Sequence, residues 1–381
     1  LLCLACGDNR IEKGPIKRSG QADVVSLDDD WRFIRYGLQA DGTRVEEPAG
    51  MFEPATDDSD WETLDVPHDF AIKGPFRMDL AGNTGRLPFQ GIGWYRKTFT
   101  VDEADQGKRF YVDFDGVMAN AQVWLNGEYV GTWPYGYNSF RLDLTPFIQV
   151  GKENLLAVRT DTEKWDSRWY PGAGIYRHVW LVKTGQVHVR HWGTKMETTN
   201  LTEKTADLHF TVEVENHLNE ETQAVVKTSV YELDSLDCLG KRVLRFDDQT
   251  LPLKAMSAGK VDLQKQMDDC KRWDIESPNR YMACVTIQVD GEETDRYYTP
   301  FGVRETSVSR DGFFLNGRRV EIKGVCNHHD LGALGAAFNR SALERQFRIM
   351  REMGCNSIRT SHNPPAPELL DLADKTGMLI M

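Results

Sequence analysis

The stretch that decides the fold is residues 341–364, which read SALERQFRIMREMGCNSIRTSHNP. Apolar side chains recur at helical spacing along its first half: Leu343, Phe347, Met350 and Met353. Ser341 and Glu344 have the spacing of a capping box, which predicts that a helix starts here, and Gly354 is a residue type that ends helices. Residues 356–360 then predict a strand. The stretch is therefore expected to form a helix followed by a strand.

The segments on either side continue this alternation. Asn316-Gly317 predicts a hairpin into a strand over residues 320–325. Residues 367–375 predict a second helix, and Met378 begins a third strand. A β-α-β-α-β order implies parallel strands joined by right-handed crossovers, as in a (β/α)8 TIM barrel. Because such a barrel needs eight strands and roughly 250 residues, residues 302–381 are expected to hold only its first strands and helices.

Two all-β regions precede this incomplete barrel. Residues 26–184 contain many short alternating segments with polar turns, which predict a jelly-roll sandwich. Within this region residues 110–115 alternate apolar and polar side chains, so they predict a strand with one buried face. Residues 185–301 have the pattern of an immunoglobulin-like β-sandwich and carry no cluster of chemical groups. The predicted fold is therefore multidomain: a jelly roll, an immunoglobulin-like sandwich and the truncated start of a TIM barrel.

Composition limits the partners of the protein. The formal net charge of −12 over 381 residues argues against nucleic acid or an anionic membrane surface as a partner. Seven cysteines without a CxxC pair argue against a zinc site and against a disulfide framework, and no metal-binding residues are predicted. Five of them are expected to be small hydrophobic side chains in or near cores: Cys238, Cys270, Cys284, Cys326 and Cys355.

The N-terminal residues resemble the end of a bacterial lipoprotein signal. Residues 1–8 read LLCLACGD, in which small or apolar side chains precede Cys6. We therefore expect residues 1–25 to be a signal remnant and tether, with a lipid on Cys6 that anchors a periplasmic or outer-membrane lipoprotein of a bacterium. The alternative is an arbitrary apolar segment with two free thiols. Both ends of the sequence are expected to be cut from a longer protein.

Polar side chains gather at the ends of the first two predicted barrel strands. Residues 324–330 and 358–365 contain imidazole, guanidinium and amide groups that suit sugar hydroxyls: Asn327, His328, Arg359, His362 and Asn363. In a β/α barrel the C-terminal ends of the strands face the mouth of the active site. We therefore expect these side chains to share one sugar-binding rim. The alternative is a structural network in which they satisfy one another.

These motifs resemble those of glycoside hydrolase family 2, which includes bacterial β-galactosidases, β-glucuronidases and β-mannosidases. Residues 356–364 are similar to the family's signature, and residues 323–330 are similar to its first barrel strand. Residues 301–305 resemble the segment between its sandwich and barrel. Further segments resemble strands of its N-terminal jelly roll: residues 93–96, 115–117, 123–127 and 174–177. The resemblance spans nearly everything from about residue 26 onward.

The resemblance implies roles for the rim residues. His328 and His362 would hydrogen-bond substrate hydroxyls, and Arg359 would help to orient a catalytic carboxylate. Asn363 stands where the family often has Tyr, and Asn327-His328-His329 stands where known β-galactosidases have Arg-His-Glu. These departures lie at the rim, so the exact sugar stays open. His329 and Asp330 could equally be supporting groups.

A loop of the jelly roll is a second candidate for sugar contact. Residues 165–171 read WDSRWYP, with aromatic rings that can stack on pyranose C–H faces and charged groups that can fork onto hydroxyl pairs. Asp166, Arg168 and Trp169 are the candidate contacts. In family β-galactosidases this loop supplies an Asp, and a gapless comparison puts Arg168 at that position. The alternative is that the aromatics pack a domain interface. His68, in another family-like segment, is expected to be structural.

The resemblance also implies what the sequence lacks. The family cleaves with retention through a nucleophile and an acid/base, two carboxylates that would come from strands beyond Met381. The 381 residues are therefore expected to hydrolyse nothing by themselves. Family β-galactosidases often use Mg2+ and Na+, but the carboxylates that would bind Mg2+ also lie beyond these residues.

The predicted function is a retaining exo-β-glycosidase acting on terminal β-glycosides of oligosaccharides or polysaccharides. A β-galactosidase is favoured, and a β-glucuronidase of the same family is the first alternative. A non-catalytic carbohydrate-binding protein is the alternative from another class. A surface adhesin is disfavoured because it would not need the β/α repeats. The oligomeric state cannot be predicted from these patterns.

Overall fold

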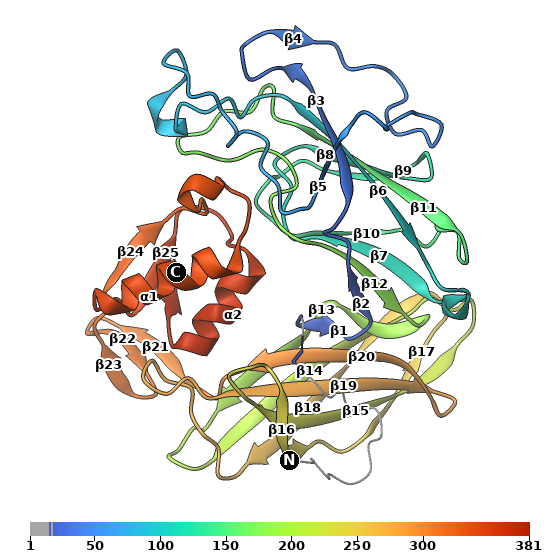
Figure 1. Cartoon of the computed structure of the whole chain (residues 1–381). Coiled ribbons are helices and arrows are strands. Elements are labelled where there is room, and N and C mark those ends of the chain that lie inside the picture. The colour runs from blue at the N-terminus through green and yellow to red at the C-terminus, as the bar shows by residue number, and fades with distance from the viewer. Residues whose placement is uncertain (1–14, 17) are drawn as a thin grey trace. The chain divides into compact units, whose positions relative to one another are not determined.

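The computed structural model describes residues 15, 16 and 18–381. Cys6 lies outside the described residues, so its predicted lipidation stays a prediction. The chain divides into two compact units (Figure 1). The sandwich unit contains 184–321, 374–377 and the described residues up to Ala22, and the site unit contains 23–183, 322–373 and 378–381. The exact domain boundaries predicted from the sequence stay predictions.

Two antiparallel sheets form the jelly roll of the site unit. The larger has the order β4-β3-β6-β11-β8-β9, with β5 beside β3. Its strands are β3 (Trp31–Leu38), β4 (Arg44–Val45), β5 (Glu62–Leu64), β6 (Ile92–Thr100), β8 (Ala121–Leu125), β9 (Glu128–Trp133) and β11 (Glu153–Asp161). The smaller has the order β10-β7-β12-β2: β2 (Val24–Ser26), β7 (Arg109–Phe114), β10 (Phe140–Asp143) and β12 (Val179–Thr184). Short 3-10 turns cover Gly82–Thr84 and Glu103–Asp105. Buried side chains such as Trp31, Phe110 and Leu156 fill one core.

The strand at residues 110–115 differs from its prediction. Phe110, Val112 and Phe114 are buried as expected, but Tyr111 and Asp113 on the opposite face are buried too. The prediction of one buried face was therefore wrong. Asp113 is tolerated there because Arg141 on β10 donates two hydrogen bonds to its carboxylate, at 2.6 and 2.9 Å. A buried charge is stable only when it is paired in this way.

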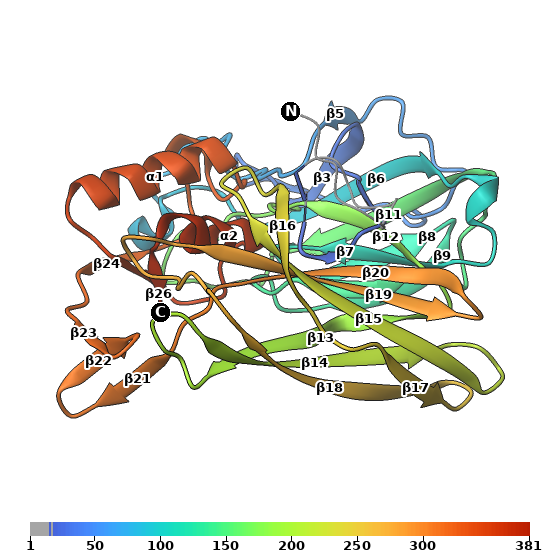
Figure 2. The same cartoon turned by 90° about the horizontal axis from the view of Figure 1, so that it is seen from below.

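The sandwich unit has an immunoglobulin-like core between two antiparallel sheets. The six-stranded sheet contains β1 (Gly20–Gln21), β15 (Thr222–Leu233), β16 (Leu239–Arg245), β17 (Gln249–Leu253), β19 (Arg280–Val289) and β20 (Glu292–Phe301). The three-stranded sheet contains β13 (Val187–Thr199), β14 (Ala206–Asn216) and β18 (Ser257–Met267). Figure 2 shows the two sheets as separate layers, and side chains from both fill the core, among them Phe210 and Val285. A further antiparallel sheet has the order β21 (Thr306–Ser309), β22 (Gly312–Leu315) and β23 (Arg318–Val320).

The start of the barrel consists of three parallel strands and two helices. The strands are β24 (Gly324–Asn327), β25 (Ser357–Thr360) and β26 (Leu379–Ile380). The helices are α1 (Arg340–Glu352) and α2 (Pro367–Thr376), with a 3-10 turn at Gly332–Leu334. Figure 1 shows both helices beside the strands, and Phe347, Ile358 and Leu372 share their core. The predicted β-α-β-α-β order is confirmed.

Two local predictions in this region were wrong. The expected strand over residues 320–325 is two strands: β23 closes the hairpin at Asn316-Gly317, and β24 pairs separately with β25. The capping box is replaced by an earlier cap, because the Asn339 side chain accepts a hydrogen bond from the Ala342 N–H at 2.9 Å. Glu344 instead receives a hydrogen bond from Arg340 one turn away, at 2.9 Å. An Asn cap satisfies the same free amides, so the helix begins slightly earlier.

The cysteines largely follow expectation. Among the described residues Cys270 and Cys284 are buried free thiols, and Cys238 and Cys355 are half-buried. Cys326 is exposed, so its predicted place in a core was wrong. It lies on β24, whose alternate side chains face opposite sides of a three-stranded sheet. In the part of the chain that the structure describes, no helix is long and apolar enough to cross a membrane.

Candidate active site

The ends of β24 and β25 lie side by side. Asn327 is in register with Thr360, and the Ser361 N–H donates to the Asn327 carbonyl at 2.8 Å. The two strands are parallel, so the polar residues that follow them leave the sheet at the same edge. The predicted convergence of the two polar segments is therefore observed.

Three rings meet at this edge. The ring centroids of Trp169 and His328 are 5.5 Å apart, and those of Trp169 and His362 are 5.4 Å apart. His328 and His362 are themselves 6.0 Å apart, and all three pairs meet edge to face. Each ring comes from a different segment: the jelly-roll loop, the end of β24 and the end of β25. The sequence predicted each of these three side chains separately as a sugar contact, and the fold places them next to one another.

Arg359 positions His362. Its guanidinium donates to His362 Nδ1 at 3.1 Å and to the Ser361 hydroxyl at 3.1 Å. A guanidinium can only donate, so Nδ1 must accept, and a neutral His362 carries its hydrogen on Nε2. That Nε2–H is then a donor of the kind that a sugar hydroxyl can accept. The predicted contact between Arg359 and a catalytic carboxylate stays a prediction.

Trp169 and His362 line a cleft of about 480 Å³, whereas His328 lines a separate, smaller cavity. The lining of the cleft combines the jelly-roll loop, the segment between β9 and β10, and the residues after β25: Trp165, Asp166, Ser167, Arg168, Trp169, Tyr135, Tyr137, His362 and Asn363. Asp166 and Arg168 are exposed, and one Asp166 carboxylate oxygen accepts the Ser167 N–H at 2.8 Å. The jelly-roll loop therefore lines the cleft, and its predicted sugar contacts stay a prediction.

The two predicted asparagines turn toward the protein. The Asn327 amide donates to the Gln346 side chain on α1 at 3.3 Å, and Asn327 is absent from the lining of the cleft. The Asn363 side chain is buried and accepts the His362 N–H at 3.2 Å. Asn363 therefore supports the loop after β25 and also lines the cleft. Their predicted substrate contacts stay untested.

His329 joins the jelly-roll loop to the barrel. Its Nε2–H donates to the Pro171 carbonyl at 3.0 Å, and its ring lies 5.5 Å from Tyr137 and 5.6 Å from Tyr176. Burial lowers the pKa of His329 from 6.5 to about 4, so the ring is neutral near pH 7. Of the two roles left open for His329, its surroundings favour the supporting one.

Asp69 was missed by sequence reasoning and forms a second junction. One carboxylate oxygen accepts the Tyr170 hydroxyl at 2.6 Å and the Ala336 N–H at 2.9 Å. The other accepts the N–H groups of Ala71 at 3.0 Å and Ala173 at 3.1 Å. Burial raises the pKa of Asp69 above its ordinary value, while these hydrogen bonds oppose the rise.

Two glycines, Gly172 and Gly335, allow the backbone to approach the Asp69 carboxylate closely. Gly172 has a φ of +71°, and an added Cβ would lie 3.1 Å from an Asp69 carboxylate oxygen. Gly335 also has a positive φ, at +63°, and a Cβ there would collide with the same carboxylate. A side chain at either position would therefore separate the loop from the barrel. The glycines after Pro171 were the available sequence signal.

Arg177 is the third junction, and it is almost fully buried. Its guanidinium donates to the carbonyls of Pro364 at 2.9 Å and Pro365 at 3.2 Å, after β25. It also donates to the carbonyls of Asp115 and Tyr137 in the jelly roll. His68, by comparison, serves only the jelly roll: its Nδ1 lies 2.9 Å from the Tyr95 hydroxyl, and burial lowers its pKa to about 4.

Three family models match successive parts of the sequence. The sugar binding domain of glycosyl hydrolases family 2 matches residues 24–185, and the family 2 model matches residues 187–304. The family 2 TIM barrel domain matches residues 306–381. The chain belongs to glycosyl hydrolase family 2. The predicted family and fold class are therefore confirmed.

Relatives within family 2 carry two activities in their names. A β-galactosidase of Bacteroides ovatus is 46% identical over 360 residues, covering 92% of this chain and 40% of the relative. A β-glucuronidase of Bacteroides fragilis is 27% identical over 373 residues, covering 96% of this chain and 50% of the relative. The chain thus spans half or less of the length of these two family 2 enzymes.

Solved structures of family 2 proteins share the fold. A member from Bacteroides cellulosilyticus superposes with a TM-score of 0.86 at 33% identity, covering 94% of this chain and 45% of that protein. A family 2 β-glucuronidase superposes with a TM-score of 0.84 at 25% identity, covering 98% of this chain and 40% of that protein. The order of jelly roll, sandwich and barrel start along the chain is therefore that of family 2.

Proposed function

We propose that these residues are part of a retaining, exo-acting β-glycosidase that prefers terminal β-galactosides. The observation that carries this proposal is the meeting of Trp169, His328 and His362 beside a cleft at the ends of two parallel strands. An indole offers a flat apolar face to the C–H face of a pyranose. The Nε2–H of His362 is a donor to a hydroxyl on the same sugar.

In this proposal the described residues bind and orient the terminal sugar. Retaining hydrolysis needs two carboxylates about 5.5 Å apart across the glycosidic bond. Glutamates from later barrel strands of the whole enzyme would supply both. The nucleophile attacks the anomeric carbon while the acid protonates the leaving oxygen, and water activated by the resulting base then releases the sugar. Trp169, His328 and His362 would hold the ring during both steps.

The preference for galactoside rests on similarity. The relative at 46% identity is a β-galactosidase, whereas a putative β-glucuronidase of Formosa agariphila is 35% identical and the β-glucuronidase of Bacteroides fragilis is 27% identical. One observation favours a β-glucuronidase as the second candidate: Arg168 is exposed and lines the cleft. A guanidinium binds a carboxylate through two parallel hydrogen bonds, and a glucuronide carries that carboxylate.

A substrate panel on the whole enzyme tests the proposal. We expect turnover of nitrophenyl β-galactoside, and Trp169→Ala should lower kcat/KM about tenfold or more because it removes the stacking face. Trp192→Ala is the matched control, since Trp192 is an exposed indole on the sandwich unit. If galactose binds but no nitrophenyl β-glycoside is cleaved, the protein is a non-catalytic carbohydrate-binding protein instead.

Arg168→Ala separates the two sugars. If the whole enzyme prefers β-galactosides, this substitution should change kcat/KM for nitrophenyl β-galactoside by less than about threefold, because no substrate carboxylate is left unpaired. If the enzyme prefers β-glucuronides, the same substitution should cost about tenfold or more for nitrophenyl β-glucuronide. A larger loss for the glucuronide, together with faster turnover of it by the parent enzyme, would replace the galactosidase proposal.

We also propose that Cys6 carries a lipid that anchors the protein to a bacterial membrane. The support is the sequence of residues 1–8 alone. Metabolic labelling of the whole protein with a fatty acid should mark the parent and leave Cys6→Ala unmarked. Equal labelling of both proteins, or of neither, would contradict the anchor.

A further inference from the structure

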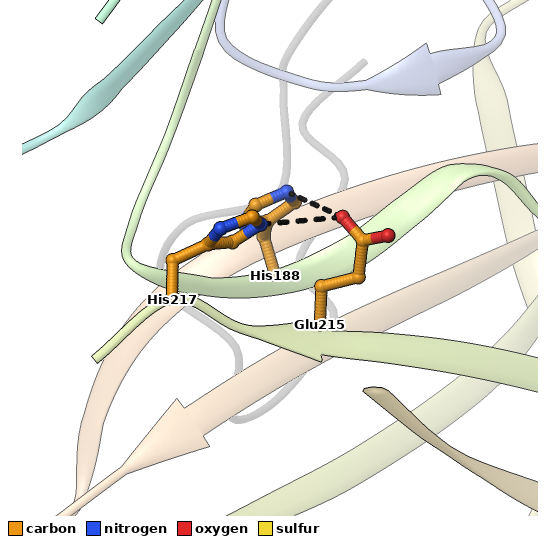
Figure 3. A group of neighbouring side chains, drawn as sticks. All are labelled: His188, Glu215 and His217. Atoms are coloured by element: carbon orange, nitrogen blue, oxygen red, sulfur yellow. Dashed lines mark hydrogen bonds and ion pairs between the residues drawn. The ribbon is translucent and has the colours of Figure 1, made fainter. Parts of the chain in front are cut away.

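Three metal-ligating side chains meet on one face of the sandwich unit. His188 lies on β13, Glu215 lies on β14, and His217 follows directly after β14 (Figure 3). The register pairs His188 with Glu215 across the two strands. Alternate residues of a strand face the same side, so His217 joins Glu215 on that face. The antiparallel pairing therefore brings two imidazoles and a carboxylate together although they are far apart in the sequence.

The distances between their ligand atoms fit a bound ion. Glu215 Oε2 lies 3.3 Å from His217 Nε2 and 3.6 Å from His188 Nε2, and all three ligand atoms lie within 4.8 Å of one another. The contact between Glu215 and His217 is a long hydrogen bond, and the contact between Glu215 and His188 lies beyond the 2.7–3.2 Å typical of N–H···O hydrogen bonds. Ligands about 2.0–2.1 Å from a tetrahedral zinc ion are separated by about 3.3 Å. The two measured spacings are therefore close to the edges of a coordination tetrahedron, although the two imidazole rings stack in parallel, with centroids 5.2 Å apart, and would have to turn toward a shared ion.

A backbone carbonyl fixes which nitrogen of His188 carries the hydrogen. His188 Nδ1 lies 3.0 Å from the Gly185 carbonyl, which can only accept a hydrogen bond, so Nδ1 carries the hydrogen. The lone pair of a neutral His188 is therefore on Nε2, the nitrogen that faces Glu215. A backbone carbonyl that fixes the tautomer in this way is a common support for a histidine ligand.

Among the described residues, Arg190 forms an ion pair with Glu215 beside the cluster. Its Nε lies 3.4 Å from Glu215 Oε1, on the oxygen that faces away from the imidazoles, so Oε2 stays available as a ligand. Its Nη1 lies 3.0 Å from Glu213 Oε2, which offsets the charge of the guanidinium. Two neutral imidazoles and one carboxylate leave a divalent ion with a net charge of +1, and the Arg190–Glu213 pair adds no net charge beside it.

We propose that His188, Glu215 and His217 bind a divalent transition metal ion of the zinc class. The three protein ligands would leave one tetrahedral position for water. Two nitrogen ligands argue against Mg2+ and Ca2+, which prefer oxygen donors. His188 is fully buried, whereas Glu215 and His217 are half-buried, so the ion would enter from their side. A bound ion would join the ends of β13 and β14, and this role is independent of the proposed glycosidase activity.

Zinc titration of the untagged whole protein tests the site. After dialysis against EDTA, calorimetry should find at least one equivalent of Zn2+ that Mg2+ does not displace. Glu215→Gln preserves the shape of the side chain but removes its charge, and His217→Ala removes one ligand. Each should weaken this equivalent at least about tenfold, because even loss of a supporting group around a metal costs that much. His209→Ala, another histidine on β14, should bind zinc as the parent does.

A second measurement separates coordination from simple charge attraction. Co2+ added to the parent protein should give the visible absorption of a tetrahedral ion, and the absorption should be lost in His217→Ala. Circular dichroism of each variant should match that of the parent, which excludes unfolding as the cause. The proposal is overturned if both variants bind Zn2+ with the parent's affinity and stoichiometry, or if the parent binds no zinc.

Discussion

The junction at His329 predicts a pH-dependent opening of the jelly-roll loop. Burial lowers the pKa of His329 from 6.5 to about 4, so the folded state binds a proton less readily than the opened state does. A base with a lowered folded pKa contributes stability that is present above its unfolded pKa and is lost as pH falls through the folded pKa. The loss therefore develops between about pH 6.5 and 4. From pH 7 to pH 5 it amounts to about 2 kcal/mol, or about a 20-fold rise in the opened fraction.

His329→Gln tests this reasoning, because glutamine can still donate to the Pro171 carbonyl but does not titrate. Hydrogen exchange measured by mass spectrometry should follow peptides that cover residues 165–177. These peptides have the same sequence in both proteins, so the intrinsic exchange rates cancel at each pH. The exchange rate of these peptides in the parent, divided by the rate in the variant, should rise about 20-fold as the pH falls from 7 to 5. His209→Gln, a control on the sandwich unit, should leave the parent behaviour unchanged. An equal pH response in His329→Gln and the parent would refute the role of His329.

Two further substitutions probe the junctions around the site. Asp69→Asn replaces one acceptor oxygen by a donor. The Tyr170 hydroxyl can reverse and accept, but the Ala336 N–H cannot, so the free energy of unfolding of the whole protein should fall by about 1–3 kcal/mol in thermal or denaturant unfolding. An unchanged midpoint would contradict this. Burial alone would lower the pKa of His178, but the hydrogen bond to Asp28 and nearby carboxylates raise it above 6.5. The stability that protonated His178 contributes is present below pH 6.5 and is lost as pH rises through its folded pKa. His178→Asn should therefore lower Tm more at pH 6 than at pH 9. A larger loss of Tm at pH 9 would refute the raised pKa of His178.

Sequence periodicity was sufficient for the architecture because it is a local property. The helical spacing of Leu343, Phe347 and Met350 predicted α1, and all three side chains are buried in its core. Caps and strand breaks were less predictable, because several nearby residues can satisfy the same backbone groups. Asn339 and Ser341 both suit a helix start, and only the path of the preceding chain decides between them.

The junctions that build the site left almost no signal in the sequence, and the reason is physical. His329 and Arg177 donate to backbone carbonyls. Three of the four hydrogen bonds to Asp69 come from backbone N–H groups, and the fourth comes from Tyr170, 101 positions away. Every residue type except proline carries the same N–H, and all carry the same C=O, so the partner of such a bond has no characteristic side chain. Sugar-facing groups are recognisable by their chemistry, whereas the contacts that hold them together are recognisable only once the fold is known. The shape of the cleft therefore depends on residues that resemble ordinary core positions, and substitutions at Asp69, Arg177 or His329 should alter substrate binding without touching the sugar.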